Sequence, residues 1–107
     1  MIKKIAIDRT NVIADGKPLG YLSLWIRRHF GIEDTKDSKN FSVEITEGED
    51  YIFIPYVGYE GRQLVSLCKV EGTKNSVIGN ICREKMQLIF PEIKKEAKYN
   101  ITVTEVD

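Results

Sequence analysis

Short segments in which apolar and polar residues alternate are the feature that most constrains the fold of this chain. In the clearest of them, Phe41, Val43 and Ile45 alternate with polar residues. A period of two places the apolar side chains on one face of a β-strand. The same pattern predicts strands at residues 2–8, 41–46, 51–57, 63–70 and 99–103. A chain of 107 residues is long enough to bury one core, so we expect a single domain over residues 1–107.

Two other segments carry apolar residues at helical spacing. Residues 18–30 begin with Pro18, which suits the first turn of a helix, and are followed by Gly31, which suits its end. The apolar stripe of this segment contains Leu19, Leu22, Trp25, Ile26, His29 and Phe30. Residues 76–90 show the same spacing between a capping Ser76 and Pro91. The spacing predicts helices over both segments.

The acidic segment 47–50, Glu-Gly-Glu-Asp, has the composition of a turn. It predicts a hairpin between the strands at 41–46 and 51–57. Pro55 has no N–H to donate to a neighbouring strand, so we expect the second of these strands at an edge of the sheet.

The expected order of elements is β-α-β-β-β-α-β. A shift of 58 residues places Phe41–Glu47 over Tyr99–Glu105, as an internal duplication would. Within a few residues, the same shift also aligns the strand at 2–8 with the strand at 63–70, and the helix at 18–30 with the helix at 76–90. Two β-α-β halves of this kind resemble the ferredoxin-like fold, an α+β sandwich, here with one strand added. Alternatively, the run from Trp25 to Pro55 resembles the swapped-hairpin repressors of the AbrB type, although it lacks their Ile-Pro entry to the helix. That resemblance implies a small β-barrel with helices.

Charge is segregated along the chain although its net value is zero. Residues 1–31 hold six basic and two acidic residues, whereas residues 32–60 hold two basic and eight acidic ones. Basic side chains that gather on one face can neutralise phosphates. The first hypothesis is therefore a small regulatory protein that binds DNA or RNA through a basic N-terminal face. The candidate nucleic-acid-binding residues are Lys3, Lys4, Arg9, Arg27 and Arg28.

Aromatic residues crowd the segment 51–59 and support a second hypothesis. An exposed edge strand with large aromatic side chains can pair with or pack against another protein. The chain would then be a protein–protein interaction module, either an inhibitor, an adaptor or a self-associating subunit such as a homodimer. It would use this edge strand and the acidic hairpin. The candidate partner-binding residues are Tyr51, Phe53, Tyr56 and Tyr59.

Motifs for chemistry are missing from the sequence. His29 is the single histidine, and Cys68 and Cys82 lie too far apart for a redox pair or a zinc site, so we expect two buried, inert thiols. Neither a P-loop nor a dinucleotide-binding glycine motif is present. These observations favour a protein with no metal, no cofactor and no catalytic residue. With no secretion signal and no apolar run of membrane-spanning length, we expect a cytoplasmic protein with no membrane association.

Overall fold

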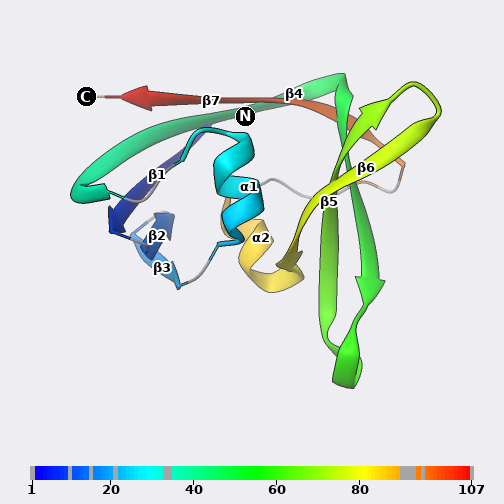
Figure 1. The fold of residues 1–107 in the computed structure, drawn as a ribbon, viewed down its shortest axis with the longest axis horizontal. Helices are drawn as coiled ribbons and strands as arrows, with labels where there is room; N and C mark the ends of the chain where they lie inside the picture. The colour runs from blue at the N-terminus through cyan, green and yellow to red at the C-terminus, as the bar shows by residue number, and fades with distance from the viewer. Residues whose placement is uncertain are drawn as a thin grey trace.

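Most of the described chain is β-strand, and all of its strands join one sheet (Figure 1). The structure is a computed structural model that describes residues 2–9, 11–14, 16–20, 22–32, 35–89, 94 and 96–106, without the side chains of residues 9, 20 and 35. The strands are β1 (Ile2–Arg9), β2 (Asn11–Ala14), β3 (Lys17–Gly20), β4 (Thr35–Val57), β5 (Gln63–Glu71), β6 (Lys74–Cys82) and β7 (Lys98–Val106). Their order in the sheet is β3-β2-β1-β4-β5-β6, and β7 lies beside β4. The helices are α1 (Leu24–His29), α2 (Arg83–Ile89) and the short 3-10 helix η1 (Tyr59–Gly61).

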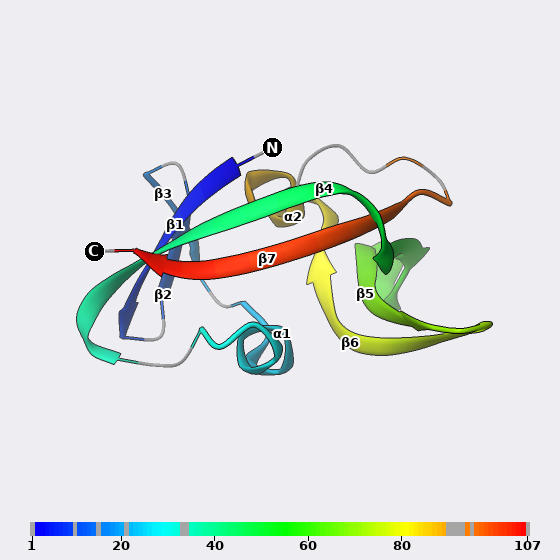
Figure 2. The ribbon, with the colours of Figure 1, turned by 90° about the horizontal axis from the view of Figure 1, so that it is seen from above.

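The ferredoxin-like α+β sandwich predicted from the sequence is wrong. A ferredoxin-like sandwich would pack two long helices on one face of a small sheet, whereas the described residues of this chain form seven strands in one antiparallel sheet and helices of only six and seven residues. The sheet curls around the two short helices instead of lying flat beneath them (Figure 2). The alternative prediction, a small β-barrel with helices, is the closer description because the curled sheet forms about half of such a barrel.

β4 replaces the hairpin expected around residues 47–50. Glu47 and Tyr51 both pair with Tyr99 of β7, so residues 48–50 form a bulge within one continuous strand. At this bulge the Glu49 N–H donates a hydrogen bond of 3.1 Å to Asn100 Oδ1. A Cβ atom at Gly48 would overlap the Asn100 side chain, so the close approach of β7 requires glycine there. The strand turns a corner at the bulge, and its second half pairs with β5 (Figure 1).

The helix predicted over 18–30 is confirmed only at its end. Residues 17–20 form β3, in which Pro18 pairs with Ile13 of β2. β3 ends the sheet, and an edge strand is the position in a sheet at which proline is tolerated. α1 is limited to residues 24–29, and Trp25, expected on its buried stripe, is 66% exposed.

The helix predicted over 76–90 is likewise confirmed only for its last half, as α2. The preceding residues form β6, which makes a hairpin with β5. Gly79 lies in β6 directly beneath α1, and a Cβ atom there would be 2.8 Å from Ile26 Cγ1. This glycine is unfavourable in a helix interior, but it lets α1 pack closely on the sheet.

The two segments related by the shift of 58 residues are neighbours in the sheet. Phe41–Glu47 pairs antiparallel with Tyr99–Glu105, and Glu44 lies opposite Thr102, its own counterpart under the shift. The relation does not extend to β1 and β5, because β1 pairs with the first half of β4 and β5 with the second. The two segments therefore pair directly with one another in one sheet, whereas they would be separate outer strands in a ferredoxin-like sandwich.

The core lies on the concave side of the curled sheet, where it contacts α1 and α2. One cluster of buried apolar side chains includes residues of all seven strands and of both helices. Its most buried large members are Ile7, Leu19, Ile26, Leu67, Met86 and Ile89. Among the described residues, no helix has the length and apolar character needed to cross a membrane.

Candidate interaction surface

The structure does not gather the candidate nucleic-acid-binding residues on one face. Arg27 is 2% exposed, and its Nε donates a hydrogen bond of 3.1 Å to the Leu22 carbonyl. This bond ties the segment before α1 to the helix. Lys3 and Lys4 are consecutive in β1 and point to opposite faces of the strand. Arg28 is exposed and lies over the Trp25 ring, while the side chain of Arg9 lies outside the described residues. Nucleic-acid binding through these residues stays a prediction.

The four candidate partner-binding aromatics divide between core and surface. Tyr51 and Phe53 are buried, and the Phe53 ring meets the Tyr99 ring edge-on at 5.7 Å. Tyr56 points to the opposite side of the strand and is half-buried, and Tyr59 in η1 is 84% exposed. Only Tyr56 and Tyr59 are thus placed to contact a partner.

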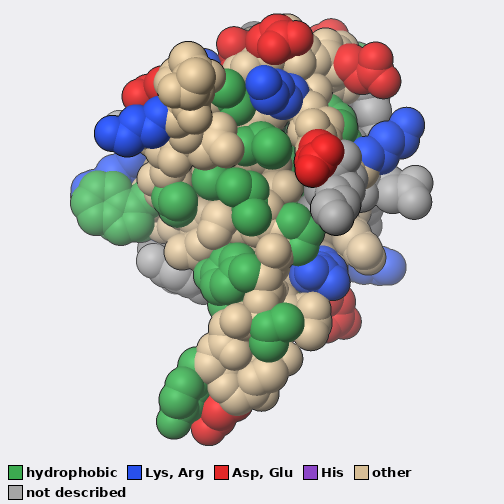
Figure 3. Space-filling model, turned by 90° about the vertical axis from the view of Figure 1, so that its right-hand side faces the viewer, with side chains coloured by type: hydrophobic (Ala, Val, Ile, Leu, Met, Phe, Trp, Pro, Cys, Tyr) green, Lys and Arg blue, Asp and Glu red, His purple; other side chains and the backbone are tan. Residues whose placement is uncertain are grey.

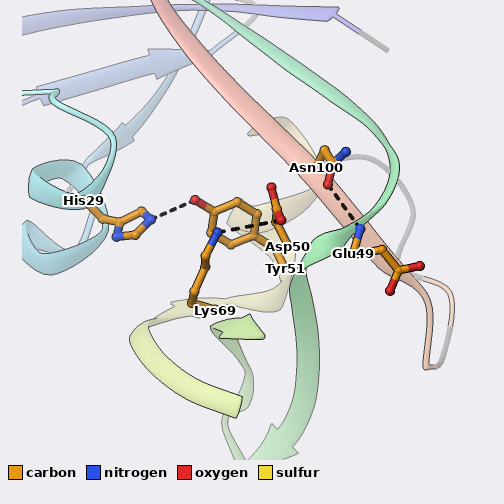
Figure 4. Close-up of polar contacts among 6 residues, drawn as sticks. All are labelled: His29, Glu49, Asp50, Tyr51, Lys69 and Asn100. Carbon is orange, nitrogen blue, oxygen red and sulfur yellow. Dashed lines mark hydrogen bonds and ion pairs between the residues drawn. The ribbon is translucent and has the colours of Figure 1, made fainter. Parts of the chain in front are cut away.

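A polar cluster joins α1 to the bend of β4 (Figure 4). His29 Nε2 and the Tyr51 hydroxyl lie 2.8 Å apart. Lys69 of β5 lies over the Tyr51 ring, 4.7 Å from its centre, and forms an ion pair of 3.9 Å with Asp50. The cluster therefore fixes the last turn of α1 against the sheet.

Electrostatics in this cluster favour the neutral forms of both ring side chains. Burial, with the Lys69 ammonium nearby, lowers the pKa of His29 below 6.5. Burial, with the Asp50 carboxylate nearby, raises the pKa of Tyr51 above 10.0. In this state the histidine tautomer decides whether His29 Nε2 or the Tyr51 hydroxyl donates the hydrogen bond between them. Because the His29 and Tyr51 side chains are hydrogen-bonded to each other, we interpret the pair as a structural link between α1 and β4.

The opposite side of the β4–β5–β6 sheet carries the clearest unexplained feature of the molecule. Paired residues of an antiparallel sheet direct their side chains to the same face, so the strand register defines which side chains lie there. We call this the outer face. It consists of Ile52, Ile54, Tyr56, Leu64, Ser66, Cys68, Val70, Asn75, Val77, Asn80 and Cys82. The inner face of the same strands carries Tyr51, Phe53, Val65 and Leu67 and packs on the core.

None of the eleven outer-face side chains is charged, although 30% of the chain's residues are. Figure 3 views the molecule from this side and shows hydrophobic side chains gathered over the strands, with charged ones around them. Val77 is 61% exposed and Ile54 is 38% exposed. Lys98 of β7, which pairs with Ile52, is a charged residue at the border. Exposed apolar patches of this kind mark binding sites in soluble proteins.

The two cysteines differ in position, and both are free thiols. Cys68, in the central strand, is fully buried, and burial raises the pKa of its thiol. Cys82, at the end of β6, is exposed, so the expectation of two buried thiols is wrong for this residue. Within the described part of the chain, no three His, Cys, Asp or Glu side chains gather as a metal site would require.

Sequence reasoning missed the outer face for two reasons. The second hypothesis treats the aromatic residues of 51–59 as one surface, although the period of two places Tyr51 and Phe53 on the side of the strand opposite Tyr56. The helix predicted over 76–90 also concealed Val77 and Asn80 as strand residues on this face. The usable signal was Gly79, which disfavours a helix at that position.

The face must be interpreted from its own geometry. Comparisons with protein-family models, with curated proteins and with solved structures found no match to this chain.

Proposed function

We propose that this chain is a self-associating interaction module in which two copies pack their outer faces against one another. The observation that carries the proposal is the uncharged outer face of the β4–β5–β6 sheet, with Ile54 and Val77 exposed at its surface. Two sheets packed in this way stack about 10 Å apart and interdigitate their side chains.

The charge of the face favours a second copy as the partner. A charged partner would find no charged side chain on the three strands to pair with. A second copy presents the same uncharged face, so the two faces do not repel each other. The net charge of zero also means that two copies do not repel each other at long range. Ser66 Oγ donates to Asn80 Oδ1 over 2.7 Å, so two of the polar groups on the face are already paired with each other.

The size of the face suits a weak and reversible dimer. Three strands about 4.8 Å apart, with on average about eight residues at about 3.3 Å each, give a footprint of roughly 400 Å² per copy. Tyr59 of η1, which is 84% exposed at the adjoining β4–β5 tip, can enlarge it. Two such footprints approach the total of about 1,000 Å² that a specific interface requires. The area supports association at the low end of stable interfaces.

Sedimentation velocity over a concentration series tests the proposal, with Val77→Lys as the main variant. In the dimer the ammonium group of this lysine would lose its water against an apolar face, so we expect the variant to weaken association roughly tenfold or more. Ile2→Lys is the matched control, because Ile2 is 62% exposed but lies in β1, outside the outer face. Thermal unfolding of each variant verifies that the fold is retained.

The expected result is a mass that rises with the concentration of the wild-type protein and of Ile2→Lys, but not of Val77→Lys. A wild-type protein that stays monomeric at millimolar concentration would rule out the proposal. Association that Val77→Lys and Ile54→Lys leave unchanged would also rule it out, since a different surface would then be responsible.

A further inference from the structure

A hollow of about 590 Å³ lies where the end of the outer face meets α2. Its lining is Arg62, Gln63, Leu64, Cys82, Arg83, Glu84 and Gln87. This volume is within the range of small-molecule sites, which span about 300–1,000 Å³. The hollow goes beyond the proposed self-association, because most of its lining lies outside the outer face.

Strand register explains why two arginines meet in this hollow. Leu64 and Cys82 pair where β5 begins and β6 ends. Arg62 comes just before this pair, and Arg83 comes directly after it as the first residue of α2. The Gly58 N–H donates a hydrogen bond of 2.8 Å to the Arg62 carbonyl, which closes the loop around η1 and fixes the backbone that carries this arginine.

Both guanidinium groups lack a protein partner within the part of the chain that the structure describes. Across the described residues, neither Arg62 nor Arg83 forms a side-chain hydrogen bond or an ion pair. Glu84 is the one acidic residue of the lining, so the two arginines leave the hollow with a net positive charge. Arginine forms paired hydrogen bonds with the oxygens of carboxylate and phosphate groups. The amides of Gln63 and Gln87 can donate further hydrogen bonds to the same kind of group.

We propose that this hollow binds a small organic anion, with a phosphate or carboxylate group held between Arg62 and Arg83. The apolar part of the ligand lies against Leu64, whose half-buried side chain packs over Gly58. The ligand neutralises the two arginines and covers the Cys82 thiol.

Alkylation of Cys82 by the neutral reagent iodoacetamide, followed by mass spectrometry, tests this binding. Cys68 is buried, so the reaction reports on Cys82. The probes are phenyl phosphate, benzoate and inorganic phosphate, added to the whole chain at constant ionic strength. We expect saturable protection of Cys82, with phenyl phosphate or benzoate effective at lower concentration than inorganic phosphate. Equal potency of inorganic phosphate would overturn the role given to Leu64.

Two variants and one control decide whether the arginines are responsible. Arg62→Gln and Arg83→Gln should each weaken protection about tenfold, since each removes one charge-assisted contact. Arg28→Gln removes an exposed arginine on α1 and should leave protection unchanged. The proposal would be overturned if the probes gave no protection at 10 mM, which is roughly the weakest affinity of a specific small-molecule site. It would also be overturned if the variant carrying both Arg62→Gln and Arg83→Gln were protected as well as the wild-type protein.

The same measurement in Val77→Lys separates this proposal from self-association. Protection by the probes should be the same in this variant, because Val77 does not line the hollow. Protection that instead follows protein concentration and disappears in Val77→Lys would come from the second copy, and would overturn the anion site while supporting the dimer.

Discussion

The two faces of the β4–β5–β6 sheet are built by the same strands but meet different surroundings. On the inner face, Phe53 and Leu67 are 4% and 0% exposed and pack on the core. On the outer face, Ile54 and Val77 are 38% and 61% exposed. The sequence neighbours Phe53 and Ile54 thus have similar hydropathy and opposite environments. Burial in this sheet is set by which side the helices cover, and apolar character alone does not distinguish core from binding surface.

The largest expected effect on stability is the difference between truncating Phe53 and truncating its neighbour Ile54. Phe53→Ala should lower the free energy of unfolding by about 3–5 kcal/mol, because it leaves a cavity beside Tyr99. Ile54→Ala should cost less than about 1 kcal/mol, since its side chain is already partly in water. Chemical denaturation at a concentration below association measures both. Similar losses in the two variants would contradict the difference between the faces.

The contact between α1 and the inner face can be tested at Gly79. Gly79→Ala places a Cβ atom 2.8 Å from Ile26 Cγ1 and 2.9 Å from Ser23 Oγ, so the helix must shift. We expect a loss of about 1–3 kcal/mol in the free energy of unfolding. Asn75→Ala, an exposed substitution on the outer face, is the control and should change it by less than about 0.5 kcal/mol. A neutral Gly79→Ala would show that α1 does not pack on β6 in this way.

The smallest expected effect concerns the polar link between α1 and Tyr51. Tyr51→Phe removes the hydrogen bond to His29 and should cost about 0.5–1.5 kcal/mol. The folded chain holds His29 with its pKa below 6.5, so the unfolded chain takes up the proton first as the pH falls. This part of the stability is present above pH 6.5 and is lost as the pH falls through the folded pKa.

Denaturation midpoints between pH 8 and pH 5 (a window spanning the usual histidine range of about 6.5) measure this dependence. His29→Gln, which cannot titrate, should show a smaller decline toward low pH than the wild-type protein. An equal decline in the two proteins would assign the effect to carboxylates elsewhere in the chain.

Local sequence patterns predicted the strands well and their partners poorly. The alternating segments at 2–8, 63–70 and 99–103 all lie in strands. The segment 47–50 has turn composition, but the deciding contact is with Asn100 of β7, far away in sequence. Residues 76–82 fit a helical spacing as well as a strand, and only the pairing with β5 decides between them. The outer face depends on both of these pairings, so it could not be located before the strand register was known.

The pairing of β7 with β4 has a consequence for how the chain reaches this structure. β7 pairs with the first half of β4 at residues separated by about 58 positions, as Glu44 and Thr102 illustrate. Closing such a long loop carries an entropic cost before the pairing can stabilise it, and sheets rich in distant contacts fold slowly. During synthesis, the side of β4 that will receive β7 has no strand beside it until the C-terminal segment has been made. The newborn chain therefore passes through a stage in which the first half of β4 is an open strand edge, a feature that favours aggregation.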